Sequence, residues 1–265
     1  MYRFDYHRAA SVAEAADRLK AAEDGTLMAG GQTLIPTLKQ RLAAPTDVID
    51  LTGIADIVGV AVEGGQVTVG AMTTHAEVAA SHEVRSAIPA LAALADGIGD
   101  PQVRNRGTLG GSIANNDPAA DYPAALLGLG AVVITNAREI GADDFFTGMF
   151  ETALDDGEIV TAVRFPVPRA AAYVKFPNPA SRYAIVGVFV ARTGDGVRVA
   201  VTGAGPGVFR VPEMEAALAA NFSADAVAGI AVAPDDLNTD LHASADYRAS
   251  LVTTMAKRAV AAAGG

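Results

Sequence analysis

Two glycine-rich segments carry the residues whose types and spacing could do chemistry. The first is Ala29-Gly-Gly-Gln-Thr-Leu-Ile-Pro36, and the second is Arg104-Asn-Arg-Gly-Thr-Leu-Gly-Gly-Ser-Ile-Ala-Asn-Asn-Asp-Pro-Ala-Ala-Asp121. Glycine lets a backbone come close to a ligand and adopt positive φ, and successive N–H groups in such a turn form a concave anion site. We interpret the two segments as opposite walls of one site for a phosphate-containing ligand.

A single Gly-Gly turn is weak evidence, because it more often only marks a loop. The presence of two similar segments indicates a ligand site. Each segment places hydroxyl or amide side chains beside two adjacent glycines: Gln32 and Thr33 in the first, Thr108 and Ser112 in the second. Neither contains the Gly-Lys-Ser/Thr of a Walker A loop or the Gly-x-Gly-x-x-Gly of a Rossmann site. Both segments are expected to follow short strands. Together they could donate many N–H and O–H groups to a pyrophosphate without a lysine.

The composition excludes several other kinds of site. The chain has no cysteine, so it holds no disulfide and no thiolate-ligated zinc or iron–sulfur centre. Its four histidines are scattered without ligand spacing, and we expect no protein-bound metal; they are His7, His75, His82 and His242. The net charge is −10 and no Lys/Arg cluster is present, which argues against nucleic-acid binding. Without a signal-like start or an uncharged apolar run of about 18 residues, a cytoplasmic chain with no membrane span is expected.

The elements around the first segment predict a small α/β unit. Ser11 and Glu14 form a capping-box pattern in front of a helix over residues 12–22. A strand at 26–29, a helix at 33–42 and a strand at 47–51 follow. This order favours parallel strands, and it places the first glycine turn at the carboxyl end of a strand, where open α/β sheets bind ligands.

The middle of the chain reads as strands and apolar helices. We expect a hairpin over 57–62 and 66–70, helices over 88–98 and 122–129, strands over 131–135 and 158–165, and a loop or short helix over 143–150. Pro166 and Pro168 then mark the best candidate domain boundary. The predicted organisation is a ligand-binding domain over 1–166, with subdomains of about 1–55 and 56–166, and a C-terminal α+β domain over 167–265.

The C-terminal part predicts a small antiparallel sheet followed by helices. Its strand-like runs are 171–176, 184–192 and 197–203, and its helix-like runs are 212–220, 224–232 and 243–263.

Six ordered motifs resemble those of one protein family. The two glycine-rich segments are similar to the FAD-binding segments of the molybdenum hydroxylase flavoproteins, and the medium, FAD-binding subunit of aerobic carbon-monoxide-dehydrogenase-type enzymes is the most similar type. The other matches, in the family's order, are Gly70-Ala-Met-Thr-Thr-His-Ala76, Asp144-Phe-Phe-Thr-Gly148, Glu158-Ile-Val160 and Ala180-Ser-Arg-Tyr-Ala-Ile-Val-Gly187. The resemblance covers roughly residues 2–205.

The resemblance implies an α+β protein with a vanillyl-alcohol-oxidase-type FAD-binding fold. It would have a small α/β subdomain, a mixed-sheet subdomain, and a C-terminal three-stranded antiparallel sheet with helices. The FAD pyrophosphate would lie between the two glycine-rich segments, with contacts from Ala29, Gly30, Gly31, Gln32, Thr33, Thr108, Leu109, Gly110, Gly111 and Ser112. Where the family commonly has histidine and serine in the first segment and asparagine in the second, this chain has Gln32, Thr33 and Ser112.

The resemblance also implies roles for five further residues. Asp121 would hold a ribose hydroxyl or an adjacent group, and Ile159 or Val160 would meet the adenine through backbone atoms. Lys175 would approach the flavin ring, and Tyr183 would lie against the isoalloxazine. No residue of this chain is assigned as catalytic with certainty, because a flavin would supply the redox chemistry.

The same resemblance implies partners and leaves alternatives open. A small subunit with two [2Fe–2S] clusters and a large molybdenum–pterin subunit would deliver electrons to FAD and then to an external acceptor. The alternatives are a self-sufficient flavin oxidase or reductase, for which His75 or Tyr183 would be the acid or base, and a non-enzymatic nucleotide-binding module.

Several residues support structural interpretations as well as functional ones. His75 follows two threonines at a helix start, where a buried structural histidine is about twice as common as a catalytic one. Arg104 and Arg106 offset phosphate charge or shape the loop through carbonyl groups. Asp117 before Pro118 sets a turn, and Phe145-Phe146 is most simply a hydrophobic plug.

Overall fold

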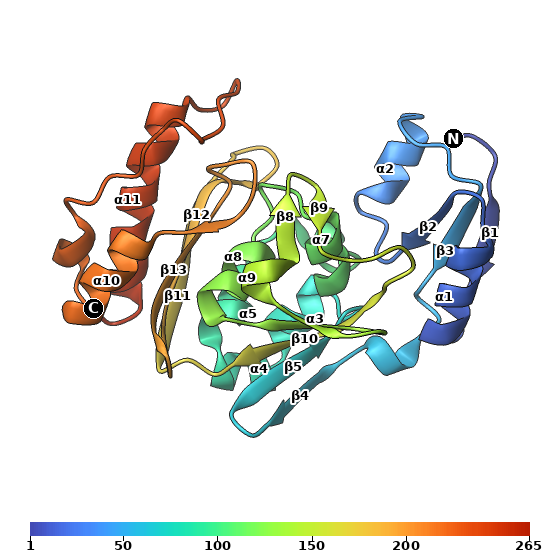
Figure 1. The fold of residues 1–265 in the computed structure, drawn as a ribbon, viewed down its shortest axis with the longest axis horizontal. Coiled ribbons are helices and arrows are strands. Elements are labelled where there is room, and N and C mark those ends of the chain that lie inside the picture. Colours follow the sequence, from blue (N-terminus) through green and yellow to red (C-terminus); the bar gives the residue numbers. More distant parts are fainter.

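The computed structural model describes residues 1–265 as three sheet-and-helix units arranged in a row (Figure 1). The first unit contains β1 (Asp5–Arg8), α1 (Val12–Ala21), β2 (Gly25–Met28), α2 (Leu34–Lys39) and β3 (Asp47–Asp50). Its sheet has the order β1-β3-β2, and both pairings are parallel. The predicted parallel α/β unit is confirmed. β1 was not expected, because its four residues alternate without a clear apolar face.

Local sequence explains the helices of this unit. Ser11 caps α1 by accepting a hydrogen bond from the Glu14 N–H at 3.1 Å, as the capping pattern predicts. α2 is shorter than the expected 33–42, because the chain turns left-handed at Arg41 with φ of 61°.

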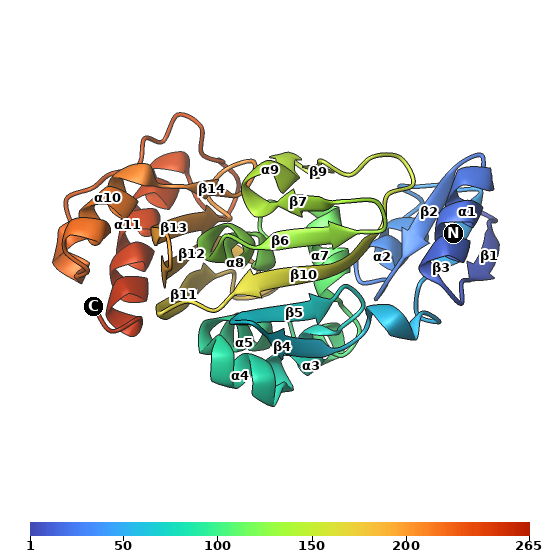
Figure 2. The same ribbon diagram turned by 60° about the horizontal axis from the view of Figure 1, so that its bottom comes forward.

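The central unit is a five-stranded sheet with helices. The strands are β4 (Val60–Glu63), β5 (Gln66–Gly70), β10 (Val160–Pro166), β6 (Val132–Thr135) and β7 (Glu139–Gly141), in that spatial order. All four pairings are antiparallel, so the parallel strands of the molecule are confined to the first unit. The helices are α3 (His75–Ala80), α4 (His82–Ala87), α5 (Pro89–Asp96), α6 (Pro101–Arg104), α7 (Leu109–Asn115), α8 (Tyr122–Leu129) and α9 (Ala142–Phe145). Figure 2 shows the sheet from the side that the helices leave open.

Two small elements complete the central unit. A 3-10 turn, η1 (Ala55–Ile57), links it to the first unit, and a short ribbon of β8 (Phe146–Gly148) with β9 (Glu151–Thr152) follows α9. The expected strand before the second glycine segment is wrong, because α6 precedes it. The segment itself forms α7, whose N-cap Thr108 accepts a hydrogen bond from the Gly111 N–H at 3.1 Å. This cap and the left-handed Asn116 at the other end stabilise a helix that its glycines disfavour.

The C-terminal unit contains three long antiparallel strands and a short fourth. They are β11 (Ala170–Pro177), β12 (Ala184–Thr193), β13 (Gly196–Thr202) and the two-residue β14 (Phe209–Arg210), and α10 (Pro212–Ala220) and α11 (Ala245–Ala262) follow. The expected helix over 224–232 is wrong. Only the 3-10 helix η2 (Ala224–Val227) forms, because Gly229 and Pro234 interrupt the run.

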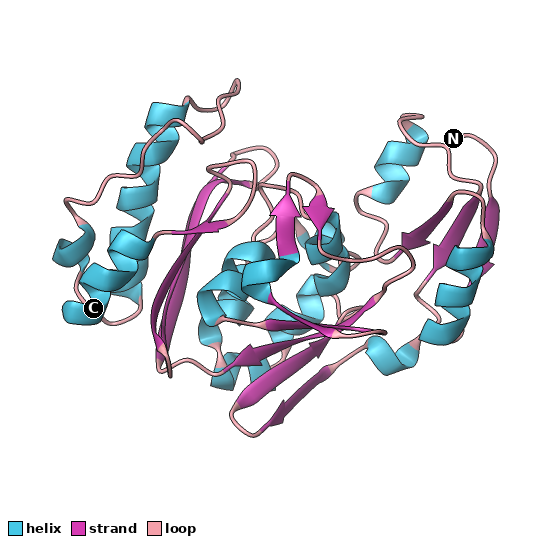
Figure 3. Cartoon of the chain, in the orientation of Figure 1, coloured by secondary structure: helices cyan, strands magenta, loops and turns pink.

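The C-terminal sheet packs on both faces, as Figure 3 shows. Side chains alternate along β12: Phe189 and Ala191 belong to the core of the central unit, whereas Val188 and Val190 belong to the core under α11. Gly128 of α8 leaves room for this packing, because a Cβ there would lie 2.6 Å from the Phe189 ring. The domain boundary after Pro166 stays a prediction, since the two units share one core. No helix is long and apolar enough to cross a membrane.

Candidate functional site

A cleft of about 810 Å³ lies where the first unit meets the central unit, and both glycine-rich segments line it. Its volume lies within the range of small-molecule and cofactor sites. The loop after β2, the start of α7, the β9–β10 loop and residues 181–183 contribute to its walls. The structure therefore brings together the two segments that the sequence pairs.

The glycines allow chain segments to pack closely against one another. A Cβ on Gly30 would overlap the backbone carbonyl of Arg106, and a Cβ on Gly110 would lie 2.6 Å from the Ala71 Cβ. A Cβ on Gly107 would lie 2.6 Å from His75 Nε2. At Gly30 and Gly110 the neighbours include backbone atoms, which cannot move aside as the end of a flexible side chain can. Gly30 brings the first wall into direct contact with the second, and Gly107 and Gly110 let the second segment pack against His75 and Ala71.

The first segment presents a row of free backbone donors. β2 ends at Met28, and residues 29–33 form a turn in which Gly31 has φ of 71° before α2 begins. None of the N–H groups of these five residues donates to a backbone carbonyl, and none donates to a side chain. All five residues are partly or fully exposed and line the cleft. Such a row of N–H groups at the end of a strand and the start of a helix is an anion site.

The second segment differs, because the backbone N–H groups of residues 109–112 are already used. They donate from Leu109 to the Thr73 carbonyl (3.1 Å), from Gly110 to the Ala71 carbonyl (2.8 Å), from Gly111 to Thr108 Oγ1 (3.1 Å) and from Ser112 to the Thr108 carbonyl (3.0 Å). Among residues 108–112 only Thr108 has an N–H group without a hydrogen bond inside the chain, so the second wall offers fewer backbone donors than expected. The glycines of α7 dock its first turn onto the end of β5, so this wall offers the side chains of Ser112 and Asn115 instead.

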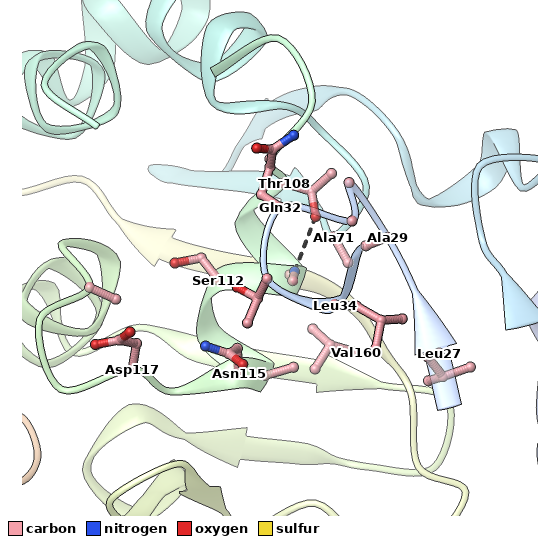
Figure 4. A pocket seen from close by; sticks show the side chains of 18 of the residues that line it. Leu27, Ala29, Gln32, Leu34, Ala71, Thr108, Ser112, Asn115, Asp117 and Val160 are labelled. Carbon is pink, nitrogen blue, oxygen red and sulfur yellow. Dashed lines mark hydrogen bonds between the residues drawn. The ribbon is translucent and has the colours of Figure 1, made fainter. Parts of the chain in front are cut away.

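Polar and apolar side chains occupy different parts of the cleft (Figure 4). In this view Ser112, Asn115 and Asp117 lie along one part, whereas Leu27, Leu34 and Val160 gather in another. Sequence reasoning missed Leu27, Leu34 and Asn115, and only the regular order strand–turn–helix could have indicated them. The apolar part can receive a flat heterocycle, and the free N–H groups lie beside it.

The expected backbone contact of Ile159 or Val160 with the adenine stays a prediction, and the backbone groups of Ile159 already have partners. Its N–H donates to Asn136 Oδ1 at 2.8 Å, and its carbonyl accepts from the Asn136 N–H at 3.0 Å. Both groups are therefore occupied by one asparagine that sequence reasoning did not single out. Val160, which is buried and faces the cleft, offers its side chain.

Asp121 forms a buried polar cluster at the cleft. Its carboxylate accepts hydrogen bonds from the Tyr173 hydroxyl at 2.5 Å and from Lys175 Nζ, which lies 3.0 Å from the nearer oxygen. Lys175 also donates to the Gly97 carbonyl at 2.9 Å. Burial raises the pKa of Asp121, although Lys175 and Tyr173 favour its charged form. The residues expected at the ribose and at the flavin ring thus bind each other, and Lys175 does not line the cleft.

Tyr183 lies on a tight loop at the edge of the cleft. Asn178 holds this loop, because its Oδ1 accepts from the N–H groups of Ala180 (2.9 Å) and Ser181 (3.2 Å). Tyr183 is 47% exposed and lines the cleft, as expected of a residue that contacts a flat ring. Partial burial raises the pKa of its hydroxyl, and the charges of Asp117 and Asp121 add to this effect.

Acidic residues outnumber basic ones in the wall of the cleft. The carboxylates are Asp117, Asp121, Asp155, Asp156 and Glu158, and the one guanidinium is that of Arg182. Arg182 was missed by sequence reasoning; its left-handed φ of 63° is a structural feature with no sequence signal. An anionic ligand here must be held by neutral hydrogen-bond donors more than by cations.

The β9–β10 loop is fixed by an ion pair between the buried Glu158 and the partly exposed Arg138. Glu158 accepts hydrogen bonds from Arg138 Nε and Nη2, both at 3.0 Å, from Thr135 Oγ1 at 2.6 Å and from the Asp155 N–H at 2.8 Å. These bonds, chiefly those from Arg138, lower the pKa of Glu158 to about 2. The pair orders the part of the loop that faces the free N–H groups.

The residues with two interpretations take structural positions. His75 is buried, and burial together with the charge of Arg104 lowers its pKa to about 4. Arg104 Nη1 donates to the carbonyls of Ile98 (3.0 Å) and Gly99 (3.1 Å), so it shapes the loop. Asp117 accepts from the Ala119 N–H, as a turn residue does. Phe145 is fully buried. Arg106 is exposed beside a smaller cavity.

Free N–H groups beside an apolar pocket, in a cleft of this size, are typical of proteins that bind a phosphate-containing cofactor. The family model described as "FAD binding domain in molybdopterin dehydrogenase" matches residues 2–168. Because it spans more than half of the chain, the protein belongs to this family. It is an FAD-binding subunit of a molybdenum-hydroxylase-type oxidoreductase, of the carbon monoxide dehydrogenase kind.

Relatives cover nearly the whole chain. The nicotine 6-hydroxylase medium subunit of Paenarthrobacter nicotinovorans is 37% identical, with 98% of this chain and 96% of the relative aligned. The carbon monoxide dehydrogenase medium chain of Hydrogenophaga pseudoflava is 35% identical over 98% and 97% of the two chains. Among solved structures, Cu,Mo-CO dehydrogenase matches with a TM-score of 0.90, 32% identity and 99% and 98% coverage. Quinoline 2-oxidoreductase from Pseudomonas putida 86 matches with a TM-score of 0.89, 28% identity and 98% and 96% coverage.

Proposed function

We propose that this chain transfers electrons within a three-subunit molybdenum hydroxylase. A small subunit with two [2Fe–2S] clusters delivers electrons to the FAD of this chain, and an external acceptor takes them away. A large subunit with a molybdenum–pterin cofactor oxidises the substrate. The absence of cysteine supports this division, because a chain without thiolates needs a partner to hold iron–sulfur clusters. The relatives' names, medium subunit and medium chain, also support a multi-subunit assembly.

The observation that carries the proposal is the row of five free N–H groups at residues 29–33. A diphosphate accepts many hydrogen bonds. Backbone N–H groups at the end of a strand and the start of a helix can donate them without a lysine or arginine. Ser112 and Asn115 face it from the second wall. The apolar part at Leu34 and Val160 fits the adenine, which leaves the edge at Tyr183 for the flavin ring.

FAD supplies the redox chemistry when it is bound, and the chain binds and orients it. Asp121, held by Tyr173 and Lys175, lines the cleft and would be a hydrogen-bond acceptor in a fixed position for the cofactor. A self-sufficient oxidase is not favoured, because His75 Nδ1 is buried without a partner and Gly107 packs against Nε2. His75 lines the cleft, but its imidazole is buried and its pKa is lowered to about 4, which does not favour it as a general acid at neutral pH.

Spectroscopy of the full chain tests the proposal. Purified protein supplied with FAD should show flavin absorbance near ~450 nm that survives desalting. Reduced iron–sulfur subunit should then bleach it faster than the isolated chain is bleached by any organic substrate alone. Protein that retains no flavin would overturn the cofactor assignment. Flavin that is retained but not reduced by the partner subunit would overturn the electron-transfer role.

A further inference from the structure

The turn between β8 and β9 carries two exposed apolar side chains. Gly148 pairs with Glu151, so Met149 and Phe150 form a two-residue loop. Met149 is 49% exposed and Phe150 is 55% exposed. Figure 1 shows this ribbon projecting beside α7 at the top of the central unit. Neither side chain belongs to a core of the molecule.

The backbone of this turn is strained at Phe150. Its φ is 56°, in the left-handed region that glycine or asparagine normally supplies in two-residue turns. A bulky side chain is uncommon there, and it persists only where the surroundings fix the backbone. The phenylalanine is thus not explained by the turn itself or by packing within the chain.

Asn116 fixes this backbone from inside. It is 1% exposed, and its Nδ2 donates to the carbonyls of Gly148 (2.8 Å) and Glu151 (2.7 Å). Its own carbonyl accepts from the Phe150 N–H at 3.2 Å. These three bonds clamp both sides of the loop and present Met149 and Phe150 outward in one geometry.

The clamp also joins the turn to the cofactor cleft. Asn116 lies between Asn115 and Asp117, and both of these line the cleft. The turn is therefore attached directly to the wall of the cleft, and a protein bound at the turn would lie beside it. Aromatic residues and methionine are enriched in the buried centres of protein interfaces, where a few anchors carry most of the binding energy.

We infer that Met149 and Phe150 are the anchor by which this chain docks the iron–sulfur subunit that feeds the cleft. The inference rests on the proposed function, because the protein that delivers electrons must contact the surface beside the cofactor. The occupant is an apolar pocket on that subunit, and the rigid turn lowers the entropy lost on docking.

The strained backbone gives a sharp test. In Phe150→Gly the strain is relieved and the anchor is removed, so the melting temperature of the FAD-loaded full chain should rise or stay unchanged. Its affinity for the iron–sulfur subunit, measured by sedimentation velocity, should fall on the order of tenfold or more. Met149→Ser should weaken binding in the same direction. If Phe150 had only a structural role, its substitution would instead lower the melting temperature and leave the affinity for the iron–sulfur subunit unchanged.

Leu241→Ser is the matched control, because Leu241 is 90% exposed elsewhere on the chain. It should leave the affinity unchanged. The inference is overturned if Phe150→Gly and Met149→Ser bind the iron–sulfur subunit like the original chain. It is also overturned if the isolated chain dimerises through this turn, shown by a dimer that Phe150→Gly abolishes. Flavin content distinguishes the two proposals: loss of FAD binding in the unaltered chain refutes the proposed function, whereas normal flavin with normal docking refutes only the anchor.

Discussion

At the scale of single residues, the glycines of the site matter because they have no side chain and so allow close contact between segments. Gly30 lies against the Arg106 carbonyl, so the first wall can approach the second only without a side chain. The same position belongs to the row of free N–H groups at residues 29–33. Contact between the walls and the geometry of the donors therefore depend on one residue.

Gly30→Ala should disturb both properties. Because the new methyl group meets backbone atoms, the substitution should lower the free energy of unfolding by about 1–3 kcal/mol. It should also weaken FAD binding, measured by fluorescence titration, because the N–H row is displaced. Gly229→Ala is the control, since a Cβ on Gly229 meets nothing within 4 Å. Unchanged FAD affinity in Gly30→Ala would contradict the assignment of this row to the diphosphate.

Residue types alone could predict which segments form the site but not which atoms are free. The pattern of glycines with Thr108 and Ser112 correctly brought the two walls together. It could not show that Gly110 and Gly111 spend their N–H groups inside the protein. Likewise, the pairing of Asp121 with Lys175 joins residues far apart in sequence, and no local signal encodes it.

At the scale of elements, local sequence predicts where capped helices begin and where apolar strands run. Tertiary contacts decide whether glycine-rich segments and loops become ordered. The capped α1 and the long strands β12 and β13 follow from capping and apolar runs. α7 was expected as a loop because it contains two adjacent glycines, which disfavour a helix. Its docking onto β5 and its caps outweigh that cost. The β9–β10 loop is ordered by Glu158, whose partner Arg138 lies on another turn.

The Glu158 ion pair makes the stability of this loop depend on pH. The pKa of Glu158 is lowered from its ordinary value near 4.5 to about 2, chiefly by Arg138. Its stabilisation is therefore complete above pH ~4.5 and is lost as the pH falls towards 2. Glu158→Gln should destabilise the chain by about 1–2 kcal/mol at neutral pH, after allowance for solvent screening.

Urea unfolding of this variant and of the original chain from pH 7 down to pH 3 measures the effect. The difference between the two proteins should shrink steadily as the pH falls. The exposed Glu23→Gln should show no such pH-dependent difference. A constant difference across the range would show that the charge of Glu158 is not what orders the loop.

At the scale of the whole molecule, the cleft is a joint between two units with different sheets. The first unit supplies the free N–H groups from a parallel sheet, and the central unit supplies the second wall from helices on an antiparallel sheet. The core of the first unit includes Met72 and Ile159 of the central unit, and the central and C-terminal units also share a core. A ligand in the cleft bridges the first of these two joints.

This arrangement predicts which ligands stabilise the chain. At a hundredfold excess over its Kd, a ligand that binds only the folded state adds about 2.7 kcal/mol, a rise in melting temperature of roughly 5–10 °C for a chain of this size. FAD and ADP both carry a diphosphate and an adenine, so both should raise the melting temperature, FAD more. Riboflavin, which has neither group, should have little effect at the same concentration. The N–H row at residues 29–33 and the apolar part at Leu27, Leu34 and Val160 would bind the diphosphate and the adenine. A riboflavin effect equal to that of FAD would contradict this assignment, because the binding energy would then lie at the flavin end.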